Sequence, residues 1–335
     1  MHIDFIGSIF CRYEHIPPEQ QRKLHLELGT FLGSKTSLDN NVTIDISFEQ
    51  LYLSDKHSTD DPILLPSSLV AVATEQINKV CPEFIQDREK FARWNLEAGK
   101  LSLESSNFRV ASYFFDKGIA FLGEGLWSKD AHTLSLQLNE GRANTLYALG
   151  QATDAGKCAS SIIEKVPFED SLNAQLLLIR SFDCNGDNDR AISKAIEVLR
   201  ELGVIDFPSD PSPATFKNAI IKTIQEASRY DYDEIPHLHQ DRICEKSRII
   251  LKIMDAVTIA CFRRGTRYLP LLASAMVSFS LNHGVCKESA SAFAVFGYFS
   301  IYVLSDFEEA RRHGNITLKI LERTHTQRFV HKILC

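Results

Sequence analysis

The feature that most constrains this chain is a short pattern that occurs four times within apolar stretches of helical spacing. Each copy begins with a small or turn-forming residue and carries an alanine five positions later. In an αα-hairpin the small residue permits a tight turn, an Asp or Asn caps the second helix, and the alanine lets the two helices approach closely. The copies are Ser106–Ala111, Gly150–Ala155, Gly186–Ala191 and Ser305–Ala310.

Each alanine is followed, one helical turn later on the same face, by another residue of the predicted helix–helix contact. The first three alanines are 44 and 36 residues apart, which is a loose match to the 34-residue tetratricopeptide unit and is compatible with longer helices or loops. The pattern predicts an all-α fold, a TPR-like superhelical array of antiparallel helix pairs. An unrelated helical bundle with chance matches is the alternative. The predicted structural repeat positions are Ala111, Phe115, Ala155, Ala159, Ala191, Ala195, Ala310 and Gly314.

Three prolines between Gly203 and Pro213 interrupt the helical periodicity, because proline cannot continue a helix. We therefore predict TPR-like repeats over 86–204, a Pro-rich break over 205–213 and further TPR-like helical hairpins over 214–335. The helices expected after the break include 242–262 and 269–282, with a polar, acidic loop over 230–241 before them. Residues 1–85 are predicted to be a helical segment with a loop near 34–66, where the alternation from Val42 to Leu53 is the main strand-like stretch.

The composition of the chain excludes or disfavours several classes of protein. The net charge is −6, and no basic stripe of the kind that binds nucleic acid is found in the sequence. The eight cysteines are scattered and form no Cys-x-x-Cys, which favours small core hydrophobes of a reduced cytoplasmic protein over a disulfide framework. Ser289–Ser305 is uncharged but short for a membrane span, and we expect a buried central helix there instead. No membrane partner is expected.

The sequence gives only weak evidence for any ligand-binding site. Gly150–Cys158 resembles a phosphate-binding loop, but five residues separate its glycines and Cys158 replaces the hydroxyl residue that would reach Mg²⁺. His237 and His239 lie near Asp231, Asp233, Glu234 and Asp241, yet a solvated acidic loop is favoured over a zinc site. No catalytic, cofactor-binding or metal-binding residue is assigned, and no cofactor is expected.

Isolated charged and titratable residues have structural explanations. Arg263, Arg264 and Arg267 are expected to interact with the carbonyl groups at a helix C-terminus, with contact to an acidic partner as the alternative. Glu308-Glu309 is expected to favour the helix dipole in the first turn of a repeat helix. His25, His132, His283 and His313 are predicted to be surface or helix-end residues.

The order of segments from Glu89 to Ile333 resembles the helical region of large multidomain signalling proteins. In these, a serine/threonine-kinase-like domain and a STAND-type AAA ATPase precede tetratricopeptide-like repeats, and a GAF and histidine-kinase module often follows. Within residues 1–85, which resemble the tail of the ATPase region, Ile16–Gly29 resembles the amphipathic helix that closes that region, and Val72–Asn78 resembles the short helix before the repeats. The other resembling segments are Ala92–Lys100, Ala111–Phe114, Gly118–Gly123, Ala191–Leu199 and Ser305–Gly314.

The resemblance implies a non-catalytic helical-repeat module for protein interaction and regulation in signal transduction, like the region that links an ATPase to a histidine or serine/threonine kinase. Its partner would be a protein or a neighbouring domain on a concave helical surface. The alternative is a fragment of a multidomain signalling ATPase or protein kinase. Its nucleotide site would then lie before Met1 and its histidine-kinase module beyond Cys335.

Overall fold

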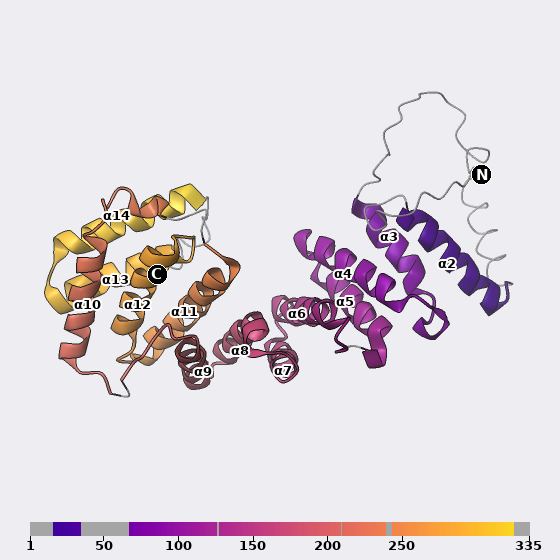
Figure 1. Ribbon diagram of the computed structural model, residues 1–335, viewed down its shortest axis with the longest axis horizontal. Helices are drawn as coiled ribbons and strands as arrows, with labels where there is room; N and C mark the ends of the chain where they lie inside the picture. The colour runs from indigo at the N-terminus through magenta and orange to yellow at the C-terminus, as the bar shows by residue number, and fades with distance from the viewer. Residues whose placement is uncertain (1–15, 35–66, 126, 209, 239–242, 325–335) are drawn as a thin grey trace, which may run out of the picture. The chain divides into compact units, whose positions relative to one another are not determined.

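The computed structural model describes residues 16–34, 67–125, 127–208, 210–238 and 243–324, and in these ranges the chain is all-α (Figure 1). It contains thirteen α-helices there, with four short 3-10 turns and no strand. The predicted all-α class is therefore confirmed. The chain divides into two compact units, Met1–Gln151 and Ala152–Cys335, which are described separately below. The predicted strand-like stretch from Val42 to Leu53 lies outside the described residues.

The first unit is a succession of helices in which each one packs against the next along the chain. Of the two N-terminal segments in the resemblance, Ile16–Gly29 is helical from Pro18 onward and Val72–Asn78 is helical throughout. Asp87 caps the third described helix by accepting the Lys90 backbone N–H at 3.1 Å. The helices are α2 (Pro18–Ser34), α3 (Ser67–Asn78), α4 (Arg88–Glu104), α5 (Phe108–Leu122) and α6 (His132–Ala148).

Two glycines allow the helices of the first unit to approach closely around one aromatic ring. Phe115, on α5, is 1% exposed. A Cβ atom on Gly99 of α4 would lie 2.6 Å from the Phe115 ring, and one on Gly141 of α6 would lie 2.5 Å from it. Since real Cβ atoms are not found so close to other carbon atoms, glycine is needed at both positions. The predicted repeat position at Phe115 therefore lies between α4 and α6.

The second unit begins with a similar succession and then changes its packing order. Helices α7, α8 and α9 pack in sequence, and α11 packs against both α8 and α9. In contrast, α10 packs mainly against α12, which is two helices further along the chain. The helices are α7 (Ala152–Ile163), α8 (Leu172–Cys184), α9 (Asn188–Glu201), α10 (Pro213–Ala227), α11 (Glu245–Arg264), α12 (Leu269–His283), α13 (Ser289–Leu304) and α14 (Phe307–Thr324).

The packing order of the helices changes at the proline-rich break. Helix α9 ends at Glu201 and α10 begins at Pro213, the last residue of the predicted break. The predicted repeat segment, 86–204, spans the boundary between the two units. The assignment of repeats and domain boundaries therefore stays a prediction.

The arginine cluster at the C-terminus of α11 holds three parts of the second unit together. Arg263 pairs with Asp183 at the end of α8, at 2.9 Å. Arg264 makes two hydrogen bonds to Asp189 at the start of α9, at 2.9 and 2.7 Å. Arg267 pairs with Asp210 in the proline-rich break at 2.8 Å. Helix-end carbonyl groups are thus an incomplete explanation of this cluster, because each arginine has an acidic side chain of the same chain beside it.

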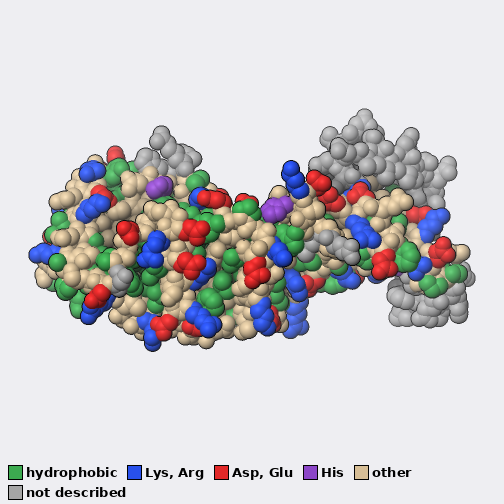
Figure 2. All heavy atoms as spheres, turned by 60° about the horizontal axis from the view of Figure 1, so that its bottom comes forward, with side chains coloured by type: hydrophobic (Ala, Val, Ile, Leu, Met, Phe, Trp, Pro, Cys, Tyr) green, Lys and Arg blue, Asp and Glu red, His purple; other side chains and the backbone are tan. Residues whose placement is uncertain are grey.

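Helix α13 contains the uncharged stretch that was considered as a membrane segment. Its N-terminal part is buried, but Tyr298 and Tyr302 near its C-terminus are 55% and 74% exposed. The expectation of a buried central helix is therefore correct as far as Ser300 apart from Tyr298, and wrong for the last turn of the helix. Among the described residues, no helix combines the length and the apolar character required to cross a membrane. On the face shown in Figure 2, basic and acidic side chains are interspersed.

Candidate functional site

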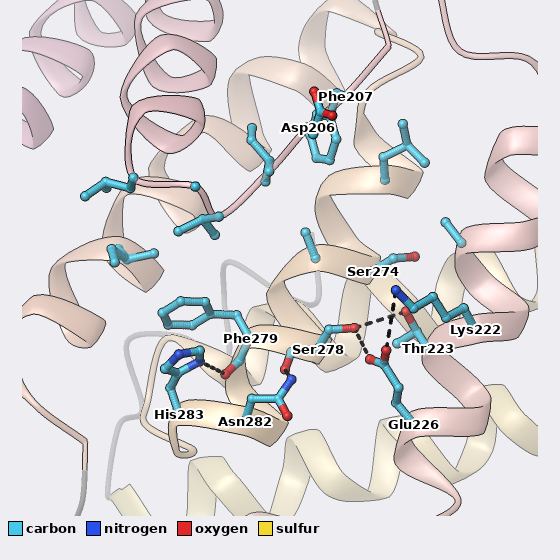
Figure 3. A pocket seen from close by; sticks show the side chains of 18 of the residues that line it. Asp206, Phe207, Lys222, Thr223, Glu226, Ser274, Ser278, Phe279, Asn282 and His283 are labelled. Atoms are coloured by element: carbon cyan, nitrogen blue, oxygen red, sulfur yellow. Dashed lines mark hydrogen bonds and ion pairs between the residues drawn. The ribbon is translucent and has the colours of Figure 1, made fainter.

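The second unit contains an open cleft of about 720 Å³ between α10 and α12, closed at its sides by residues 202–208 and the first turns of α11 (Figure 3). We call it the α10–α12 cleft. Its principal polar and aromatic lining residues are Asp206, Phe207, Lys222, Thr223, Glu226, Cys244, Ser274, Ser278, Phe279, Asn282 and His283.

The α10 wall is positioned by the way in which the helix begins. Pro213 occupies the first helical turn, where its missing N–H costs nothing. Ser212 and Thr215 form a capping box, in which each side chain bonds the backbone N–H of the other residue at 3.3 Å. The residues Lys222, Thr223 and Glu226 lie two to three turns further along, on the side of α10 that lines the cleft.

A hydrogen-bonded seam connects the two walls. The Ser278 hydroxyl of α12 donates to Glu226 Oε2 of α10 at 2.5 Å and lies 3.4 Å from the Thr223 hydroxyl. The ammonium group of Lys222 is 3.8 Å from the other oxygen of Glu226 (Figure 3). Asn282 donates to the backbone carbonyl of Ser278 at 2.8 Å, which holds its amide at the edge of the cleft. The seam thus presents hydroxyl, amide, carboxylate and ammonium groups in a row.

One serine of this wall has no hydrogen-bond partner. Ser274 lies one turn before Ser278 and is 5% exposed, yet its hydroxyl bonds to nothing among the described residues. A buried hydroxyl without a partner costs about 1–3 kcal/mol. The cleft wall is therefore not optimised for stability at this position.

Phe279 and His283 form the aromatic end of the cleft. Their rings stack with centroids 4.0 Å apart and planes inclined by 14°. His283 Nδ1 lies 3.1 Å from the Phe279 carbonyl oxygen, which fixes the imidazole at the exposed C-terminus of α12. The prediction of a helix-end residue is confirmed for His283.

Cys244 is the N-cap of α11 and lines the mouth of the cleft. Its sulfur lies 3.2 Å from the Ser247 hydroxyl and accepts the Ser247 backbone N–H at 3.4 Å, and these bonds lower the pKa of the thiol. By contrast, burial raises the pKa of Cys286 to about 11. The expectation that the cysteines are core residues is wrong for Cys81, Cys184 and Cys244, which are exposed.

The predicted repeat positions are distributed over helices of both units. Ala111, Ala155, Ala159, Ala191 and Ala195 are fully buried, on α5, α7 and α9. Ala310 of α14 is half-buried, and its backbone approaches Gly297 of α13, where a Cβ atom would lie 3.2 Å from the Ala310 carbonyl oxygen. Gly314 of α14 has open space around the position of a Cβ atom. None of these residues lines the α10–α12 cleft, and their role as repeat positions stays a prediction.

The segments that resembled ligand-binding motifs have the following structures. From Ala152 onward, the stretch that resembled a phosphate-binding loop is helix α7, in which Lys157 pairs with Asp154 at 2.9 Å. Asp233, near the predicted histidine pair, bonds Lys319 at 2.6 Å, while His239 and Asp241 lie outside the described residues. Within the described ranges, no group of three His, Cys, Asp or Glu residues is arranged to hold a metal ion.

The prediction of a surface position is wrong for His313. Its side chain is 0% exposed, because α13 and the segment before α11 cover it. Glu309 is in the first turn of α14 as expected, but it is only 3% exposed and bonds Tyr232 rather than serving the helix dipole alone. His25 is partly buried and bonds Gln76 at 2.9 Å, and His132 begins α6.

Sequence reasoning missed the α10–α12 cleft. The signal that could have found it is the recurrence of Ser274, Ser278 and Asn282 along an otherwise apolar helix. Comparison of the sequence with models of known protein families and with curated proteins gives no match.

Proposed function

We propose that this chain is a non-catalytic helical-repeat module that binds a segment of a partner protein, with a TPR-like array as its framework. The α10–α12 cleft carries the proposal. It is an open cleft lined by polar groups at helical spacing, with an aromatic stack at one end. Such a surface matches the alternating amide groups and side chains of an extended peptide better than it matches an enclosed small molecule.

A regulatory role in signal transduction is the part of the proposal that comes from the resemblance described above, whereas the proposed cytoplasmic location comes from the scattered cysteines. The second candidate, a fragment of a multidomain signalling ATPase or protein kinase, rests on the same resemblance. A phosphate-binding loop encoded upstream in the same genomic reading frame, or a histidine-kinase module encoded downstream, would favour the second candidate.

The proposal is tested with a displayed library of random peptides selected on the full chain. Two variants with the same charge reversal on the same helix separate the cleft from the rest of the surface. Lys222→Glu changes an exposed lysine of the cleft, and Lys217→Glu changes an exposed lysine outside its lining. Selected peptides should bind the wild type and K217E equally and bind K222E at least several-fold more weakly, since K222E places a second carboxylate beside Glu226.

Equal binding to all three proteins would contradict the proposed site. A library that yields no binding peptide would contradict the proposed function itself. Circular dichroism of each variant checks that the helices remain folded, which is expected because both lysines are exposed.

A further inference from the structure

A polar cluster, in which Glu309 and His313 are buried, joins α14 to the segment between α10 and α11. Tyr232, in that segment, donates its hydroxyl proton to Glu309 Oε1 of α14 at 2.5 Å. Arg312 donates to the other oxygen of Glu309 at 3.2 Å and lies over the Tyr232 ring. His313 is on the same helix as Glu309, one turn further along, and is completely buried.

The position of His313 determines which of its ring nitrogens carries the proton. Nδ1 lies 3.0 Å from the backbone carbonyl oxygen of Glu309 and 3.4 Å from its carboxylate. Both are acceptors, so the neutral imidazole carries its proton on Nδ1 and a lone pair on Nε2. Nε2 is buried and has no hydrogen-bond partner among the described residues.

Aromatic rings surround the imidazole. The centroids of Phe296 and Phe293, both on α13, lie 4.8 and 5.7 Å from that of His313, and the Tyr232 centroid lies 5.9 Å away. A proton added at Nε2 would create an N–H without an acceptor and a positive charge within an apolar enclosure. Both effects disfavour the protonated form in the closed structure.

The charged and titratable groups that face His313 do not reverse this effect. Glu309 favours the protonated ring, but its carboxylate already accepts bonds from Tyr232 and Arg312. Arg312 opposes a second positive charge, and α13 contributes the two phenylalanines. Burial is the largest influence and lowers the pKa of His313 below its ordinary value, while Glu309 partly compensates.

We propose that His313 is the sensor of an acid-sensitive latch, in which protonation at Nε2 breaks the Tyr232–Glu309 contact and loosens α14 from α13 and from residues 230–237. An exposed ion pair between Asp233 and Lys319 spans the same two segments. Residues 230–237 belong to the connection between α10 and α11, which both line the α10–α12 cleft. Release of the latch therefore loosens the described part of this connection. The latch itself does not depend on what the cleft binds.

The size of the effect follows from proton linkage. The closed structure binds the proton more weakly than the opened one, so closure has its full stability above about pH 6.5 and loses it as the pH falls. Below that value, each pH unit shifts the opening equilibrium by at most about tenfold, until the lowered pKa of His313 in the closed structure is reached.

Hydrogen exchange of the full chain, followed by mass spectrometry, tests the latch. Wild type and His313→Phe are compared at about pH 7.5 and about pH 5.5, on either side of the ordinary histidine pKa. Intrinsic exchange rates cancel because the same peptides are compared at the same pH. In peptides covering 228–238 and 307–324, the ratio of wild-type to variant exchange should rise by up to about tenfold at the lower pH. Peptides of α4 and α5 should show no such rise.

His132→Gln is the matched control, because it removes a histidine of the first unit, at the start of α6, and should behave as the wild type does. A ratio that does not change with pH in the two peptides would overturn the proposal, as would a uniform change over the whole chain. If H313F does not fold, ring-proton NMR of the wild type decides the matter. His313 should then remain neutral at the ordinary histidine pKa, and its titration at that pKa would refute the latch.

Discussion

Replacing Gly99 with alanine tests the packing of the first unit most sharply. The new Cβ atom would lie 2.6, 2.8 and 2.9 Å from three atoms of the Phe115 ring, so the ring or a helix must move. Overpacking of this kind costs about 1–3 kcal/mol. Alanine in place of glycine within a helix contributes about 1 kcal/mol in the opposite direction. The expected net loss of unfolding free energy is therefore about 0–2 kcal/mol.

Urea unfolding followed by tryptophan fluorescence is a suitable assay, because both tryptophans, Trp94 and Trp127, belong to the first unit. A double-mutant cycle with Phe115→Leu isolates the contact. With the smaller side chain, Gly99→Ala should lose most of its cost, so the two substitutions should not be additive. A Gly99→Ala protein that is about 1 kcal/mol more stable than the wild type would refute the close approach, as would strict additivity in the cycle.

Two further substitutions probe individual positions in the second unit. Ser274→Ala should leave the unfolding free energy unchanged or raise it by about 1 kcal/mol, since the buried hydroxyl has no partner. Ser280→Ala, one and a half turns along α12, should lower it by about 1 kcal/mol because that hydroxyl bonds the Met276 carbonyl and Ser289. Equal effects in chemical denaturation would contradict this assignment. Gly314→Ala should raise the melting temperature through a gain of about 0.5–1 kcal/mol, because its Cβ position is open; a decrease would indicate an unseen contact.

The sequence predicts the helices well because their signals are local. Apolar spacing indicated α4 and α5, and three prolines marked the end of the succession before α10. The packing of α10 against α12 could not be predicted from local signals. It depends on contacts between residues more than fifty positions apart, such as Thr223 and Ser278, for which a single sequence carries no spacing signal.

The burial of His313 also could not be predicted from local sequence. Its neighbours in sequence, Arg311 and Arg312, are exposed, which is typical of a surface segment. The residues that bury it, Tyr232 and the phenylalanines of α13, come from other parts of the chain. Local polarity therefore predicted exposure, and tertiary packing determined burial.

An engineered cross-link between the walls of the α10–α12 cleft tests the central claim most directly. The hydroxyl oxygens of Thr223 and Ser278 lie 3.4 Å apart, a separation compatible with a disulfide after modest adjustment. The double variant Thr223→Cys, Ser278→Cys should oxidise within the folded chain, give a single cross-linked peptide by mass spectrometry, and lose binding of the peptides selected on the wild type. If the two new cysteines remain reduced while the helices are intact, α10 does not pack against α12, and the proposed binding site is wrong.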